Sequence, residues 1–179
     1  MPVRLVVDDG PWRGLSRADV VRRARAMMIA VQMADAELSI LLTGDDQIQN
    51  LNKIYRKKNR PTDVLAFAQR EGQHGEHAGL LLGDVVVSVP TARRQAEAAG
   101  RDLSSELTML LAHGLLHLLG WDHETPRKDR RMRLETERLC AAADTVAPER
   151  RVPPSRVKGG TARRANGDSK ARKATRSGR

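Results

Sequence analysis

Three histidines fall within eleven residues, at a spacing suited to binding one metal ion. His113 and His117 are four positions apart, so on a helix their rings project from one face, one turn apart. Gly120 can end such a helix, and His123 follows three positions later, close enough to return to the same point. Three protein ligands leave one position of a four-coordinate zinc ion open, as in catalytic sites. The spacing therefore predicts a catalytic zinc bound by His113, His117 and His123.

A packing role is the usual reason for a single histidine, but it does not explain why three of the five histidines gather here. Zinc is favoured among metals because imidazole suits it and no thiolate lies nearby. The other two, His74 and His77, lie in a polar, glycine-rich segment with nothing to complete a site. We expect both to be solvated.

The spacing of the three histidines equals that of the metzincin proteases, H-E-x-x-H-x-x-G-x-x-H. Gly114 stands where those proteases carry the glutamate that takes a proton from water. The sequence therefore predicts the metal site of a hydrolase but lacks the protease's general base.

Local patterns predict the elements that must position these residues. Apolar, β-branched runs predict strands over residues 4–7, 37–43, 64–68 and 80–89. Helical spacing and capping residues predict helices over residues 20–31, from 45 until before Pro61, and over 90–100, 105–119 and 126–143. Gly83, inside a strand, indicates a bulge or a close backbone approach. About four strands and five helices in mixed order favour an α+β fold with a small mixed sheet.

Charge divides the chain into two parts. Residues 148–179 hold eleven of the 32 Lys and Arg residues but two of the 22 acids, so they carry +9 of the net charge of +10. They have few large apolar residues, and we expect a disordered basic tail that attracts polyanions or only improves solubility. Residues 1–147 form the predicted catalytic domain.

The sequence also bears on the compartment. Cys140 is the one cysteine of the chain, which excludes an intrachain disulfide and suits a reducing cytoplasm. We find neither a secretion signal nor an apolar run of the ~18 to 20 residues that a membrane span requires. The expected location is cytoplasmic.

Three sequence blocks occur together in order. They read NKIYRKKNRPTDVLAF at residues 52–67, LGDVVVS at 82–88 and HGLLHLLGWDH at 113–123. Over residues 38–137 the chain resembles the YbeY-type bacterial endoribonucleases, which mature ribosomal RNA. The resemblance implies a small α+β domain with His113, His117 and His123 as metal ligands.

The function implied by the resemblance is that of a single-strand-specific, zinc-dependent endoribonuclease in rRNA maturation, including 16S rRNA processing, and in ribosome quality control. Its implied partners are precursor rRNA and the ribosomal subunit. With four aromatic residues in the chain, we expect phosphate contacts to dominate RNA binding. One departure is that Ala66 and Ala68 stand where the family commonly has serine and proline, so no contact by that serine carries over.

The family's signature arginine falls on Arg56. A planar, permanently charged guanidinium stabilises the negative charge that gathers on phosphoryl oxygens during cleavage. The alternative is a cation that only complements a helix C-terminus, as we expect of Lys53, Lys57 and Lys58.

The sequence leaves the general base open. Asp84 and Asp122 are candidates, although Asp122 suits better the orienting of a ligand histidine. Attack by water and attack by the RNA 2′-hydroxyl are both open.

Two rival functions remain at this stage. One is a non-catalytic, RNA-binding ribosome assembly factor with structural zinc, although structural zinc usually has four protein ligands. The other is a metzincin-like metallohydrolase acting on peptides.

Overall fold

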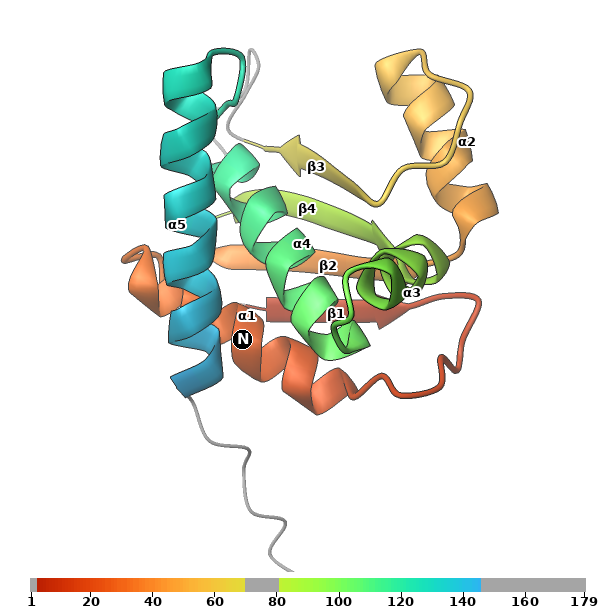
Figure 1. Cartoon of the computed structure of the whole chain (residues 1–179), viewed down its shortest axis with the longest axis horizontal. Coiled ribbons are helices and arrows are strands. Elements are labelled where there is room, and N and C mark those ends of the chain that lie inside the picture. The colour runs from red at the N-terminus through yellow and green to blue at the C-terminus, as the bar shows by residue number, and fades with distance from the viewer. Residues whose placement is uncertain (1–2, 70–80, 146–179) are drawn as a thin grey trace, which may run out of the picture. The chain divides into compact units, whose positions relative to one another are not determined.

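The computed structural model describes residues 3–69 and 81–145. These ranges form four strands and five helices, which are labelled in Figure 1. The strands are β1 (Val3–Val7), β2 (Glu37–Thr43), β3 (Val64–Ala68) and β4 (Leu81–Ser88). The helices are α1 (Arg17–Ala30), α2 (Asp45–Arg56), α3 (Val89–Ala98), α4 (Leu103–Leu118) and α5 (Pro126–Thr145). The predicted α+β class with a mixed sheet is confirmed. The predicted loop with His74 and His77 and the basic tail lie outside the described residues.

The sheet has the strand order β1-β2-β4-β3. β1 pairs with β2 and β2 with β4 in parallel, whereas β3 pairs with β4 in the antiparallel sense. β3 is therefore an edge strand, and it is the strand that continues from α2.

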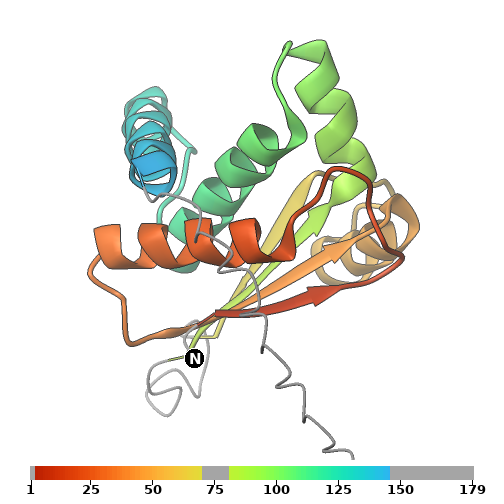
Figure 2. The same cartoon turned by 90° about the horizontal axis from the view of Figure 1, so that it is seen from below.

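The main core lies on one face of the sheet, where α1, α4 and α5 pack together (Figure 2). Ile40 and Leu42 of β2 and Val85 and Val87 of β4 point into it, because alternate residues of a strand share a face. α4 packs against β3 and β4 in the middle of this layer.

α2 covers the opposite face of the sheet. Ile48 of α2 is buried against Leu65 of β3 and Val86 of β4. These two strand residues alternate with residues of the main core, so they point to the other face of the sheet. This second, smaller core attaches α2 to β3 and β4, so that the last turn of α2 lies beside the edge of the sheet.

Gly83 accounts for an irregularity in β4. The pairing of β2 with β4 shifts register between Glu37 and Leu38, and Gly83 has a φ of 141°. A Cβ at this position would lie 2.1 Å from the backbone oxygen of Phe67, so the strand pairing requires glycine. The close backbone approach expected from the sequence is present.

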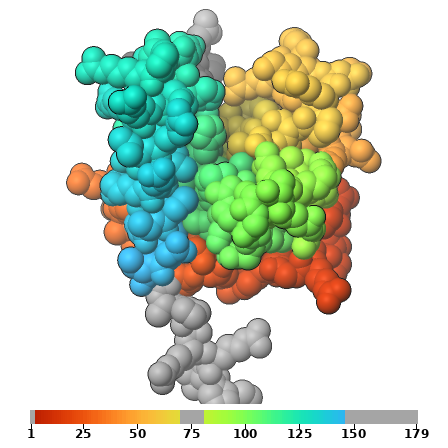
Figure 3. Space-filling view, viewed as in Figure 1, coloured from red at the N-terminus to blue at the C-terminus, as the bar shows by residue number. Residues whose placement is uncertain are grey.

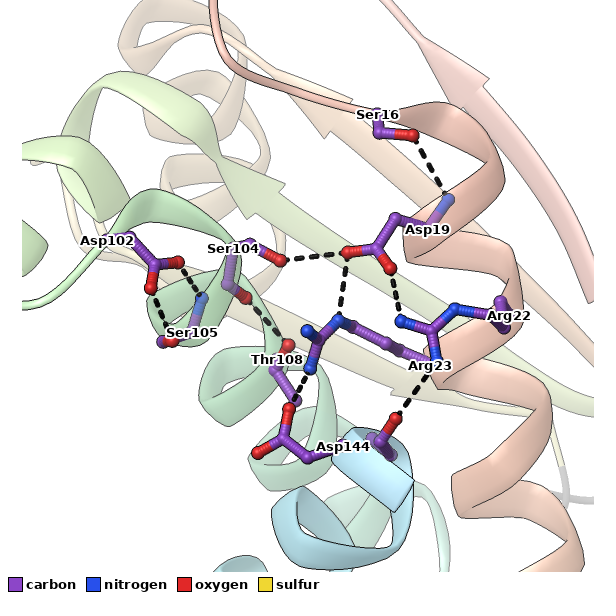
Figure 4. Close-up of polar contacts among 10 residues, drawn as sticks. Ser16, Asp19, Arg22, Arg23, Asp102, Ser104, Ser105, Thr108 and Asp144 are labelled. Carbon is purple, nitrogen blue, oxygen red and sulfur yellow. Dashed lines mark hydrogen bonds and ion pairs between the residues drawn. The ribbon is translucent and has the colours of Figure 1, made fainter. Parts of the chain in front are cut away.

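Polar contacts join the helices at the end of the core far from β3. The Asp19 carboxylate of α1 accepts hydrogen bonds from Arg22 and Arg23 and, at 2.9 Å, from Ser104 of α4 (Figure 4). Arg23 also pairs with Asp144 of α5. Burial opposes the charge on Asp19, but these hydrogen bonds outweigh it and lower its pKa.

Two further features of the described residues are the cysteine thiol and the apolar character of the helices. Cys140 is a free, partly buried thiol, and its burial raises its pKa. Among the described helices, none combines the length and apolar character that crossing a membrane requires.

Candidate metal centre

α4 carries the first two histidines on a narrow stripe of its surface. The helix begins after Asp102, whose carboxylate accepts a hydrogen bond of 2.8 Å from the backbone N–H of Ser105. Within residues 110–118, His113 and His117 are the residues that are not buried. Because the other side chains of residues 110–118 are packed, the two histidine rings lie at the one exposed strip of this part of the helix.

Gly120 ends α4 and turns the chain back. The N–H of Gly120 bonds to the carbonyl of His117, and the N–H of Trp121 to that of Leu116, both at 3.0 Å. This pair of bonds is the Schellman motif, which requires a left-handed residue, and Gly120 has a φ of 81°. The reversal brings His123 beside the end of the helix.

The three imidazoles converge on one point. The Nε2 atoms of His113 and His117 lie 3.1 Å apart, and one ring nitrogen from each of the three residues lies within 4.8 Å of the others. Two nitrogens bound tetrahedrally at about 2.0–2.1 Å from zinc are about 3.3 Å apart. The donor set and its spacing therefore fit a single metal ion.

The surroundings lower the pKa of both helix histidines, which favours the neutral form of each ring. Burial lowers the pKa of His113, and the charges of His117 and His123 lower it further. Burial also lowers the pKa of His117, followed by the charge of His123, while a hydrogen bond to the backbone of Trp121 opposes this shift. Neutral imidazole is the form that binds metals, and a bond on one ring nitrogen orients the other.

The histidines line a pocket of about 660 Å³ between α4 and the segment from α2 to β3. Figure 3 shows it as a hollow between the yellow residues of that segment and the teal start of α5. Its lining includes three cationic side chains from one side, Arg56, Lys58 and Arg60. The pocket thus combines metal ligands with groups that attract anions.

Arg56 is the last residue of α2 and lies in this pocket. One guanidinium nitrogen donates a hydrogen bond of 3.1 Å to the carbonyl of Ala66 on the free edge of β3, which leaves most of the five N–H donors of the group available. The positive charge of Arg56 acts on the histidine site, since it contributes to the lowered pKa of His117.

The neighbouring lysines divide into two kinds. Lys57 has the left-handed conformation that ends α2, and its Nζ donates to the carbonyl of Ile54 at 3.1 Å, as expected of a helix C-terminal cation. Lys58 instead lines the pocket. The sequence did not separate these roles because the left-handed turn at Lys57 decides which way each side chain points.

The two candidate bases lie in different places. Asp84 shares the α2 face of the sheet with Val86, away from α4, and does not line the metal pocket. Asp122 lines the pocket, but its carboxylate accepts from the backbone of Glu124 and from Lys128 at 2.7 Å. Hydrogen bonds with these groups, and the charge of Lys128, lower the pKa of Asp122.

Asp63 is a pocket residue that the sequence reasoning did not single out. It lines the pocket, and its charge acts to raise the pKa of His113. Its carboxylate accepts hydrogen bonds from the N–H of Val64 at 2.8 Å and from Gln95 at 3.0 Å. Asp63 lies in the first sequence block, directly before β3, and this position could have indicated a pocket residue.

The fold and the site together define a small α+β protein in which three histidines that could hold one metal ion lie beside a cationic pocket. Residues 16–144 match the family described as Endoribonuclease YbeY. The chain belongs to this family.

Similar proteins named Endoribonuclease YbeY occur in several bacteria. The protein of Myxococcus xanthus is 42% identical over 150 residues, which cover 84% of this chain and 51% of that protein. The protein of Anaeromyxobacter sp. (strain Fw109-5) is 48% identical over 135 residues, covering 75% of this chain and 69% of that protein. The chain thus spans about half the length of the first relative and more of the second.

The fold has a counterpart among solved structures. The solution structure of TM1509 from Thermotoga maritima aligns with a TM-score of 0.54 and 23% identity, covering 79% of this chain and 88% of that one. This likeness supports the architecture.

Proposed function

We propose that this protein is a zinc-dependent, single-strand-specific endoribonuclease that acts in the cytoplasm on precursor rRNA, including 16S rRNA, and in ribosome quality control. The observation that carries the proposal is the convergence of His113, His117 and His123 at a pocket walled by arginine and lysine. The names of the related proteins support the activity.

Zinc is the proposed metal because three imidazoles without a thiolate suit it. When bound, it would polarise a phosphoryl oxygen or acidify a water molecule. His113 and His117 hold their Nε2 atoms toward the site, and the closely packed α4 fixes them there.

Arg56 is the proposed catalytic residue of the chain itself. Its hydrogen bond to Ala66 holds the guanidinium at the sheet edge, where its free N–H groups can bind the phosphoryl oxygens as charge gathers on them. Lys58 and Arg60 would bind neighbouring phosphates of the strand. The ribosomal subunit is proposed as the place of action on the family resemblance alone.

The protease alternative is disfavoured by packing. Gly114 is buried, and a Cβ there would lie 2.7 Å from Cγ1 of Val85. A glutamate at this position would collide with the sheet instead of reaching a water molecule at the metal.

The proposal is tested by RNA cleavage with purified full-length protein. We expect the wild type to cut an unstructured RNA within the strand, to lose the activity on chelation and to regain it with zinc. His117→Ala should remain inactive under all three conditions, and unstructured peptide should stay intact throughout. Equal cleavage by wild type and His117→Ala would contradict the proposal.

A further inference from the structure

A second, smaller pocket adjoins the metal centre. It has a volume of about 240 Å³ and is lined by Leu119, Gly120, Trp121, Asp122, Lys128 and Arg131. Asp122 lines both pockets. Trp121 bonds through its backbone to His117 and lies two positions from His123. The small pocket is thus directly beside the ligand histidines.

Its walls include an aromatic ring and a guanidinium group. Trp121 is partly exposed, and the guanidinium carbon of Arg131 lies 5.3 Å from the centre of its ring. Aromatic rings and arginine side chains are the surfaces on which unpaired nucleobases stack. A contact of this kind can also simply stabilise the start of α5. The charges around the pair distinguish that role from ligand binding.

The first two turns of α5 are strongly cationic. Residues 127–133 contain five Lys and Arg residues and one acid, Asp129. Lys128 pairs with Asp122 and Arg133 with Asp129. Arg127, Arg130 and Arg131 are exposed and have no acidic partner within residues 3–69 and 81–145.

Two of these cations without an acidic partner lie on one surface. Arg127 and Arg131 are four positions apart, so they share a face of α5, and Arg131 borders the small pocket. Unpaired cations beside a partly exposed indole match a ligand that offers both a planar base and phosphate charge.

Resting on the function proposed above, we propose that this pocket is a nucleotide subsite for the single-stranded RNA beside the scissile phosphate. A base stacks on Trp121, and the adjoining phosphates bind Arg127 and Arg131. RNA would then cross the molecule from the α2–β3 side, past the histidines, to the start of α5. Phosphate contacts still contribute most of the RNA binding, and one stacked base is added to them.

The first test reads stacking directly. In the full-length chain with Trp12→Phe, Trp121 is the only tryptophan. On rapid mixing, before cleavage, a single-stranded adenosine 12-mer should quench its fluorescence saturably. A 12-mer without bases but with the same phosphates should bind without quenching. Equal quenching by both strands, or binding of the base-bearing strand without quenching, would overturn the subsite.

The second test reads the phosphate contacts with matched charge changes. Arg127→Gln with Arg131→Gln should lower RNA affinity about tenfold and flatten the dependence of log affinity on log salt by about 1.4, as expected for two lost contacts with a single strand. The control is Arg4→Gln with Arg13→Gln, two exposed arginines at β1 and the loop after it. The tail is the same in both, so equal losses would contradict the proposal.

The two proposals fail in different ways. RNA that quenches Trp121 but is never cut would end the proposed activity and leave the subsite. RNA that is cut without quenching Trp121, and with unchanged KM in the variant lacking Arg127 and Arg131, would end the subsite and leave the activity. Capture of an acidic peptide with the same affinity as RNA would show that the surface recognises charge alone.

Discussion

Gly114 of α4 lies directly against Val85 of β4: a Cβ on Gly114 would be 2.7 Å from Cγ1 of Val85 and 3.3 Å from Cγ2 of Val64. This contact brings the helix close to the sheet between His113 and His117, the two proposed metal ligands on α4. Gly114, which stands where the protease motif has a glutamate, is therefore a position of close helix–sheet packing.

Gly114→Ala should therefore destabilise the protein. Overpacking a core costs about 1–3 kcal/mol, and the gain in helix propensity of about 1 kcal/mol offsets it in part. Val85 is fully buried and β-branched, so it cannot turn aside easily. Thermal unfolding should show a lower Tm, and adding Val85→Ala should cost less in Gly114→Ala than in the wild type. Additive effects in this cycle would show that the two residues do not collide.

Arg56→Lys should be nearly as inactive as Arg56→Ala, because an ammonium group cannot supply the planar fork of donors. We expect single-turnover cleavage to fall by about 10²–10³, as for other donors to a developing anion. Zinc content should not change. Lys57→Ala is the neighbouring control, because Lys57 caps α2. A comparable loss in Lys57→Ala would assign the effect of Arg56 to the helix end instead of the reaction.

Asp19 should make stability depend on pH. Its pKa is lowered in the fold, despite burial, by Arg22, Arg23 and Ser104. The stabilisation is therefore present above the unfolded pKa of about 3.9 and lost as pH falls toward the folded value. Asp19→Asn should lose about 2 kcal/mol at pH 7 and show a smaller further loss between pH 5 and 2. Denaturant unfolding across pH measures this.

The control for that experiment is Asp35→Asn at an exposed position. It should follow the wild-type pH profile. A profile for Asp19→Asn that parallels the wild type at every pH would show that the charge of Asp19 is not stabilising.

A chain that ends at residue 147 should retain its metal and bind RNA more weakly. The removed residues carry +9 of the net charge, so the dependence of RNA affinity on salt should become less steep. Elemental analysis and titration with RNA at about 50 and 200 mM salt measure both effects. Loss of zinc on truncation would place the domain boundary further along the chain.

Strand bounds and the end of a helix could be predicted from the sequence, because they depend on neighbouring residues. The run at Glu37–Thr43 and the one at Val64–Ala68 match the strands residue by residue, because alternation and flanking turn residues define them. Gly120 stops α4 as expected, since its left-handed conformation is a property of the residue.

Long-range packing decided the rest. The strand order, the pocket position of Asp63 and the distance of Asp84 from the histidines depend on which strands pair and which face each residue takes. The contact of Arg131 with Trp121 depends on how α5 folds back after Gly120. No spacing within the sequence carries this information.

The proposed function requires that His113, His117 and His123 hold one zinc ion together. Elemental analysis of purified full-length protein, wild type beside His117→Ala, measures this most directly. We expect one zinc per wild-type chain and well under half of that in His117→Ala. Wild-type protein with no stoichiometric zinc, or equal zinc in the two proteins, would contradict it.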